Sequence, residues 1–263
     1  MKDILVLVHH DAGQDARLRA AVDLAQRLGG HLTCLDVTKL PATFGTEFAA
    51  GAVLLEQESR REHRNRDVVQ SWLKRQGVPW TWLDCTGSLA SSVIDAAGLA
   101  DLIVLNRRLD DAIWPDMRDV TANVLMHLHN PIVAMPEDAE GFAFERALVA
   151  WDGKPAAAAA VRSAVPLLQL ASEVEVFMVG DGADGIASDA LLAYLQRHEI
   201  TASIRVVDRG SRDVAELILD ASARLRSDYI VMGGYTHGRA AELFGGVTRS
   251  LLSKSNVPLV LSR

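Results

Sequence analysis

The sequence lacks most of what stabilises secreted proteins or anchors membrane proteins. It has two cysteines in 263 residues, Cys34 and Cys85, so a disulfide framework is not expected and a reducing cytoplasm is the simpler setting. Its apolar runs are all shorter than the ~18 residues of a membrane helix, so no membrane partner is expected. The opening MKDILVLVHHD has too short an apolar part for a signal peptide and is typical of a first strand.

Basic residues are also in short supply. Lysine and arginine number 27 against 34 aspartates and glutamates, for a net charge of −7. A nucleic-acid-binding protein needs a basic patch, so no nucleic-acid partner is expected. No Ser-His-Asp order, pair of carboxylates or metal-ligand cluster stands out as an enzyme signature. We therefore predict no catalytic residues.

What the sequence does contain is a repeat. With a shift of 127 residues, Asp101–Pro136 aligns with Asp228–Arg263 without a gap, so that DLIVLN faces DYIVMG and DVTANVL faces GVTRSLL. With a shift of 143, Ile4–Leu28 aligns with Ala147–Ala171. A third pair of segments, TGSLASSVIDAA and RGSRDVAELILDAS, keeps the same order. The repeat indicates two copies of one structural unit.

The two units span residues 1–138 and 143–263, and a segment with Pro136 and Gly141 links them. Short apolar runs alternate with amphipathic stretches in each unit. This alternation predicts parallel strands joined by helical crossovers, hence two tandem doubly wound α/β domains, each with a five-stranded parallel sheet. In the second unit, helices are expected over residues 156–170, 188–198, 213–226 and 247–255, with Ser211 as the N-cap of the third.

Ligands of such sheets bind beyond the carboxyl ends of the strands, where the strand order reverses. Two segments of the second unit meet that description, WDGK and GGYTHGRAAELFGGVT. Glycines let backbone N–H groups approach an anion, and Gly245 and Gly246 directly precede a helix, whose N-terminus favours phosphate. Thr248 could add a hydroxyl donor. Asp152, which ends the first strand, could accept from an adenine amine or a ribose hydroxyl.

With these motifs, the repeated unit resembles the universal stress protein domain, and the whole chain resembles the tandem form of that family. The resemblance implies the adenine nucleotide alpha hydrolase-like fold and an ATP site in the second unit. It also implies domains that pair through their final strands, NPIVAMP and VPLVLSR, as an internal pseudo-dimer, with a homodimer as a further pairing. The expected nucleotide-binding residues are Asp152, Gly233, Gly238, Gly245, Gly246, Val247 and Thr248, with His237 and Arg239 as accessory cations.

The sequence also departs from the family pattern. The spacing from Gly238 to Gly245 is short, and Gly246 stands where the pattern has a hydroxyl residue. In the first unit, Asn106 replaces the first glycine, Asp119 puts a carboxylate where phosphate would lie, and His9 replaces the aspartate. Like charges repel, so we do not expect the usual ATP site in the first unit. Because the sister stretch keeps its VT and flanking apolar residues but loses the glycines, the comparison favours a ligand role for the second copy.

Histidines and charged residues of the first unit are weaker candidates for a site. His9 and His10 end the first strand and could point into a cleft, but no cysteine or carboxylate at metal-ligand spacing supports them. His127 and His129 fall near a helix end, where positions two apart diverge. The run EQESRREHRNRDVVQ mixes charges at helical spacing and predicts a solvated helix face. No metal is therefore predicted from the sequence.

Two functional hypotheses remain open. The first is a cytoplasmic stress-response protein that binds ATP or another adenine nucleotide in the second unit, with at most slow ATP hydrolysis. The second is a scaffold or carrier of a different small ligand that acts through a partner, in which the glycines serve only turn geometry.

Overall fold

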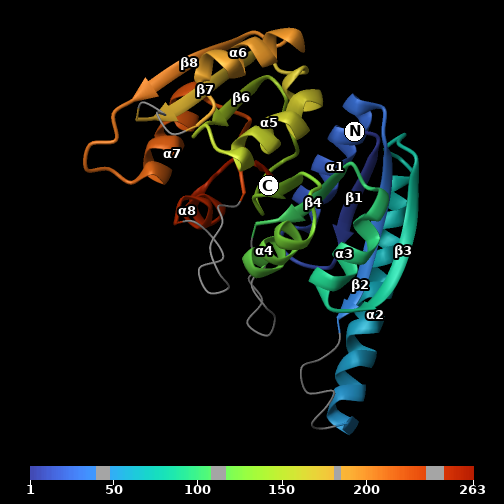
Figure 1. Ribbon diagram of the computed structural model, residues 1–263. Helices are drawn as coiled ribbons and strands as arrows, with labels where there is room; N and C mark the ends of the chain where they lie inside the picture. The colour runs from blue at the N-terminus through green and yellow to red at the C-terminus, as the bar shows by residue number, and fades with distance from the viewer. Residues whose placement is uncertain (40–47, 108–116, 181–184, 235–245) are drawn as a thin grey trace.

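The computed structural model describes residues 1–39, 48–107, 117–180, 185–234 and 246–263. Within them, strands and helices alternate along the chain and form one ten-stranded sheet with helices on both faces (Figure 1). Every strand pairing but one is parallel. The predicted α/β class is confirmed.

Each half of the chain contributes five strands to this sheet. The elements of the N-terminal half are β1 (Asp3–Val8), α1 (Gln14–Leu28), β2 (His31–Lys39), α2 (Phe48–Leu73), β3 (Trp80–Gly87), α3 (Leu89–Ala96), the short 3₁₀ helix η2 (Ala97–Leu99), β4 (Leu102–Asn106), α4 (Met117–His127) and β5 (Ile132–Met135). Those of the C-terminal half are β6 (Arg146–Ala150), α5 (Pro155–Leu168), β7 (Glu173–Val179), α6 (Ser188–Arg197), β8 (Ala202–Val207), α7 (Val214–Leu225), β9 (Tyr229–Gly233), α8 (Gly246–Lys254) and β10 (Leu259–Ser262).

The strand order is β3-β2-β1-β4-β5-β10-β9-β6-β7-β8, so the two halves have the same internal order and meet at β5 and β10. These two strands pair antiparallel, with Val260 opposite Val133, Leu259 opposite Ala134 and Leu261 opposite Ile132. Val133 and Val260 are equivalent positions of the repeat, so a local two-fold relation passes between them and the contact is isologous. The last strand of the chain therefore lies in the middle of the sheet, and the edges are β3 and β8.

The core consists of two layers, one on each face of the sheet. In β1, Ile4 and Val6 belong to one buried cluster and Leu5 belongs to the other, as the period of two in a strand requires. Helices α1, α2, α5 and α6 cover the first face, and α3, α4, α7 and α8 cover the second. Both clusters contain residues of both halves, so the core is continuous across the β5–β10 contact.

Helix α2 corrects the prediction of a solvated face. Val69 and Leu73 are buried, and the same stripe continues toward the N-terminus through three buried polar side chains, those of Glu58, Glu62 and Asn65. Charge alternation concealed the stripe, because the apolar residues that the structure describes in it, Val69 and Leu73, lie at the C-terminal end of the helix. The spacing of these positions, three or four residues, was the available signal.

The predicted cap of α7 is also wrong. Asp213, and not Ser211, is the N-cap, and its Oδ1 accepts a hydrogen bond of 2.8 Å from the backbone N–H of Ala215. Both residue types suit this position. Gly210 has a φ of +52° in the turn before the helix. This turn determines that Asp213, and not Ser211, is next to the first helical turn.

Candidate functional site

A cavity of about 340 Å³ lies in the C-terminal half, at the carboxyl ends of β6 and β9. From β6 the chain continues to β7 on one side of the sheet, whereas β9 and β10 lie on the other, so this is the point where the strand order reverses. The volume is within the range of small-molecule sites. The lining residues come from both sides of that point: Ala150, Trp151, Asp152, Lys154, Ala156, Ala157, Phe177, Val179, Arg209, Val214, Ile218, Met232, Gly233, Val247 and Thr248.

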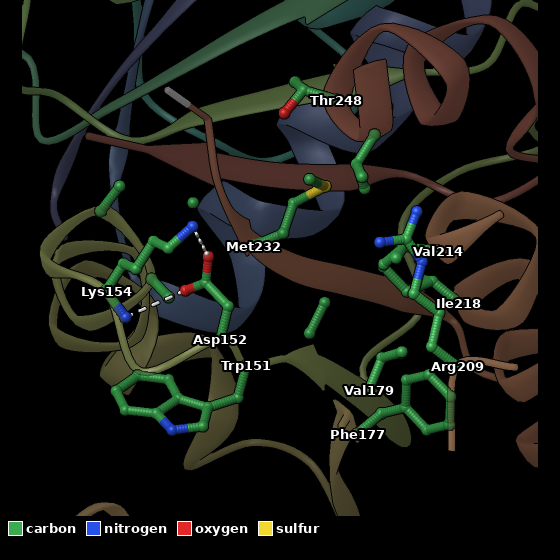
Figure 2. A pocket seen from close by; sticks show the side chains of 15 residues that line it. Trp151, Asp152, Lys154, Phe177, Val179, Arg209, Val214, Ile218, Met232 and Thr248 are labelled. Carbon is green, nitrogen blue, oxygen red and sulfur yellow. Dashed lines mark hydrogen bonds and ion pairs between the residues drawn. The ribbon is translucent and has the colours of Figure 1, made fainter. Parts of the chain in front are cut away.

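The cavity combines an apolar floor with charged rims. Phe177 and Met232 are buried and form part of the floor. Figure 2 shows Asp152 and Lys154 on one side and Arg209 on the opposite side. Two cations and one carboxylate among the described lining residues suit an anionic ligand with an apolar part.

Asp152 is held by the residues that follow it. Its Oδ1 accepts a 3.0 Å hydrogen bond from the backbone N–H of Lys154, and its Oδ2 lies 3.8 Å from Nζ of the same residue. Both side chains are about half exposed. The carboxylate is therefore oriented by the turn and by its ion pair with Lys154.

The turn that carries Asp152 is fixed by backbone contacts. Gly153 has a φ of +75°, and its carbonyl accepts a 2.8 Å hydrogen bond from the N–H of Ile186. A Cβ on Gly153 would lie 3.1 Å from Cα of Gly185, so a side chain is excluded by both conformation and space. Trp151 donates from Nε1 to the carbonyl of Ile186 at 3.3 Å. These contacts keep the loop in place without a ligand.

Gly233, the first glycine of the predicted phosphate loop, has a packing role. A Cβ there would lie 2.7 Å from the backbone nitrogen of Ala157 and 3.0 Å from Cβ of Ala156, so β9 approaches α5 too closely for a side chain. In the N-terminal half the equivalent pair is reversed. Asn106 takes the place of Gly233, Gly13 takes the place of Ala156, and a Cβ on Gly13 would lie 1.4 Å from Nδ2 of Asn106. The absence of glycine at position 106 is therefore compensated by Gly13, the N-cap residue of the facing helix α1, and it does not indicate a ligand.

Gly246 differs from Gly233 because no described residue packs against it. It is exposed at the first residue of α8, and a Cβ there would meet no atom of the described residues within 4 Å. Val247 and Thr248 follow it, and both line the cavity, Thr248 as a buried residue. The N-terminus of α8 thus faces the cavity with no steric need for the glycine.

Of the predicted site residues, the structure brings Asp152, Gly233, Val247 and Thr248 together around the cavity, with Gly246 beside them. Gly238, Gly245, His237 and Arg239 lie outside the described residues. The prediction missed Lys154 and Arg209. The lysine was visible in WDGK. Arg209 follows β8, which β6 and β7 separate from β9 in the sheet, and only the fold brings it to the cavity.

The corresponding place in the N-terminal half is occupied by buried side chains. Arg17 is fully buried, donates from Nε to the carbonyl of Leu7 and from Nη2 to that of His9, and binds both carboxylate oxygens of Asp11 at 3.1 and 2.9 Å. Its equivalent in the other half is Ala160. The alanine-rich α5 leaves space where α1 places a guanidinium. The side chain of Asp119 lies outside the described part of the chain.

Asp36, three residues before the end of β2, is buried, and its Oδ1 has no hydrogen-bond partner among the described residues. Burial, and then the charges of Glu62 and Asp84, raise the pKa of Asp36 to about 7. Burial also acts to raise the pKa of Glu62, but the close contact with His9 and its charge, with the backbone N–H of His10, outweigh it and hold that pKa below its usual value. The two carboxyl groups therefore differ in protonation near neutral pH.

The pKa of Asp36 predicts a pH-dependent stability. Between its unfolded pKa of 3.8 and about 7, the folded state keeps a proton that the unfolded state has released, so the free energy of unfolding falls as pH rises through this window. We expect the variant Asp36→Asn to lose this slope and to exceed the wild type by about 4 kcal/mol at pH 8, with little difference at pH 4. Guanidinium unfolding at several pH values measures both. Parallel pH profiles for the two proteins would show that Asp36 ionises normally.

Similarity in structure identifies the fold, although sequence comparisons do not. No family model matches the chain, and no curated protein matches it. A universal stress protein from Archaeoglobus fulgidus DSM 4304 matches 99% of this chain and 98% of its own, with a TM-score of 0.78 and 16% identity. A functionally unknown protein from Pseudomonas aeruginosa PAO1 matches 100% of this chain and 92% of its own, with a TM-score of 0.62 and 14% identity.

The chain thus has the universal stress protein fold over its full length, and the resemblance found in the sequence is confirmed at the level of the fold. Within the described part of the chain, no helix combines the length and the apolar character needed to cross a membrane.

Proposed function

We propose that the protein is a tandem universal stress protein of the cytoplasm that binds an adenine nucleotide, ATP or AMP, in its C-terminal half and acts in the stress response. The observation that carries the proposal is the cavity at the strand reversal point, which faces the N-terminus of α8 and has Asp152, Lys154 and Arg209 at its rims. The apolar floor suits a base, and the cations with the helix N-terminus suit phosphates.

Binding without efficient hydrolysis fits the chemistry of the described lining. Asp152 is the one carboxylate among the described lining residues, and it already accepts from the N–H of Lys154. A general base for hydrolysis must reach the attacking water and keep a free oxygen aimed at it. We assign Asp152 to nucleoside recognition and expect ATP turnover to be slow.

Gly246 provides the direct test of this proposal. A serine there restores the hydroxyl of the family pattern and is expected to tighten ATP binding about two- to tenfold, as one added hydrogen bond would. An aspartate puts a carboxylate beside the phosphates and is expected to weaken ATP binding at least about tenfold. Isothermal titration of the full-length protein with ATP measures both. Because no atom of the described part of the chain crowds position 246, the variants should fold as the wild type does.

The control is Gly246→Ala, which adds a methyl group but no charge or donor and should bind ATP nearly as the wild type does. A wild-type affinity in Gly246→Asp would mean that any nucleotide binds elsewhere. No heat at millimolar ATP, together with no nucleotide released from denatured protein, would overturn the proposal. It would favour the alternative of a scaffold or a different small ligand, since packing alone accounts for Gly233.

A further inference from the structure

Three metal-binding side chains meet in the N-terminal half, away from the nucleotide cleft. His9 lies just past the carboxyl end of β1, and Glu58 and Glu62 lie one turn apart on α2. Each offers a ligand atom, and these atoms all lie within 4.8 Å of one another. All three residues are buried. The exposed fraction is 2% for His9 and 1% for Glu62. The sequence singled out His9 but showed no carboxylate near it, because α2 supplies both.

The cluster is incompletely satisfied by protein groups. Oε1 of Glu58 is buried and has no hydrogen-bond partner among the described residues. The residue as a whole is 9% exposed. Nδ1 of His9 lies 2.9 Å from Oε1 of Glu62, but the pair does not have hydrogen-bond geometry. Burying a carboxylate without a partner is costly, so two carboxylates in one buried place need a compensating cation.

The nearby arginine does not fill that need. Arg61 lies on the outer side of the cluster, 3.7 Å from the other oxygen of Glu58, and donates from Nε to Nδ1 of His10 and from Nη2 to the carbonyl of His10. Its guanidinium is therefore engaged with His10, and its contact with Glu58 leaves Oε1 free.

Other contacts hold the cluster in place. Nδ2 of Asn65 donates to Oε2 of Glu62 at 3.3 Å and to Gln14 at 2.7 Å, and Gln14 donates back to Asn65 at 2.8 Å. Asn65 and Gln14 are themselves buried. A buried amide pair that orients one carboxylate is the kind of support that metal ligands have in proteins.

From these contacts we infer that the N-terminal half binds a divalent transition-metal ion between His9, Glu58 and Glu62. Two carboxylates balance the charge of such an ion, and an imidazole nitrogen favours Zn²⁺ over Mg²⁺ or Ca²⁺. The donor atoms bound to one tetrahedral zinc ion lie about 3.4 Å apart. The three ligand atoms here lie within 4.8 Å of one another, so side-chain shifts of about 1 Å would bring them all into contact with one ion. Three protein ligands leave a coordination position open for water or a small ligand. The site is separate from the nucleotide cleft and does not depend on it.

The test is titration of the chelator-treated, full-length protein with ZnCl₂. We expect one ion per chain at micromolar affinity or better, a rise in melting temperature on binding, and no comparable heat with MgCl₂. The variants Glu58→Gln and Glu62→Gln keep the side-chain shape and should each weaken Zn²⁺ binding at least about tenfold. Glu56→Gln is the matched control, because Glu56 lies on the same helix, is exposed, and should leave the titration unchanged.

A second measurement on the wild type keeps the inference testable if the glutamine variants do not fold. Mn²⁺ broadens the NMR signals of groups that bind it, and the ring signals of buried His9 should broaden before those of the exposed His127 and His129. Retention of sharp His9 signals at stoichiometric Mn²⁺ would overturn the inference. So would undiminished Zn²⁺ binding in both glutamine variants, or preference for Mg²⁺. In those cases the cluster is a buried His9–Glu62 ion pair without a metal.

Discussion

The substitution Asp11→Ala is expected to lower the free energy of unfolding by about 3–5 kcal/mol, the usual cost of leaving a buried charge without its partner. Asp11 holds both terminal nitrogens of Arg17, and the two side chains are 9% and 0% exposed. The guanidinium cannot lose its proton or reach water from that position. Guanidinium unfolding monitored by circular dichroism measures the effect.

Two controls separate the buried charge from general damage. The exposed pair of Glu56 and Arg60 on α2 should contribute little, so Glu56→Ala is expected to change stability by about 0.5 kcal/mol or less. The double variant Asp11→Ala with Arg17→Met should recover much of the loss, because it removes the unpaired charge as well. An unfolding midpoint of Asp11→Ala equal to that of the wild type would refute this account of Arg17.

The substitution Gly13→Ala is expected to cost about 2–3 kcal/mol, because its Cβ would overlap the buried Asn106 side chain. In the other half, Gly233→Ala is expected to cost a similar amount, because the atoms it meets are backbone atoms of α5. Chemical unfolding of each variant measures these values.

A double-mutant cycle tests whether Gly13 and Asn106 are a matched pair. Asn106→Gly opens the space that the new methyl group of Gly13→Ala needs, so the double variant should recover more than about 1 kcal/mol relative to additivity. If the free-energy costs of the two single substitutions simply add, the side chains at positions 13 and 106 do not compete for the same volume. The same argument makes Gly233 a packing residue first, whatever it also does for a ligand.

Periodicity and repetition carried the fold prediction, since both are local properties of the chain. The helix expected over residues 188–198 is α6, Ser188–Arg197, and the helix expected over residues 247–255 is α8, Gly246–Lys254. Buried strands such as β4 and β9 are continuous apolar runs, which are easy to recognise. The repeat then specified two similar units, because homologous segments fold alike.

The candidate sites were predicted less completely, because they combine residues from distant elements. Asp152 and Thr248 could be found from their places after a strand and at the start of a helix. Lys154 was visible in the same segment as Asp152 but was not predicted, and Arg209 enters the C-terminal cavity only through the strand order. Glu58 and Glu62 appeared as part of a mixed-charge helix surface, and only the packing of α2 on the sheet buries them beside His9.

By itself, the sequence determined the α/β class, the two-unit repeat and the approximate bounds of its helices, because these depend on periodic burial and local propensity. The tertiary structure decided which glycines are needed because a side chain would clash with neighbouring atoms. It showed that Gly233 and Gly13 permit the same close approach of a strand end and a helix in the two halves, and that no residue of the described ranges packs against Gly246. It also decided which charges are buried, because burial follows from how a helix packs on the sheet, and charge alternation along α2 does not reveal that face.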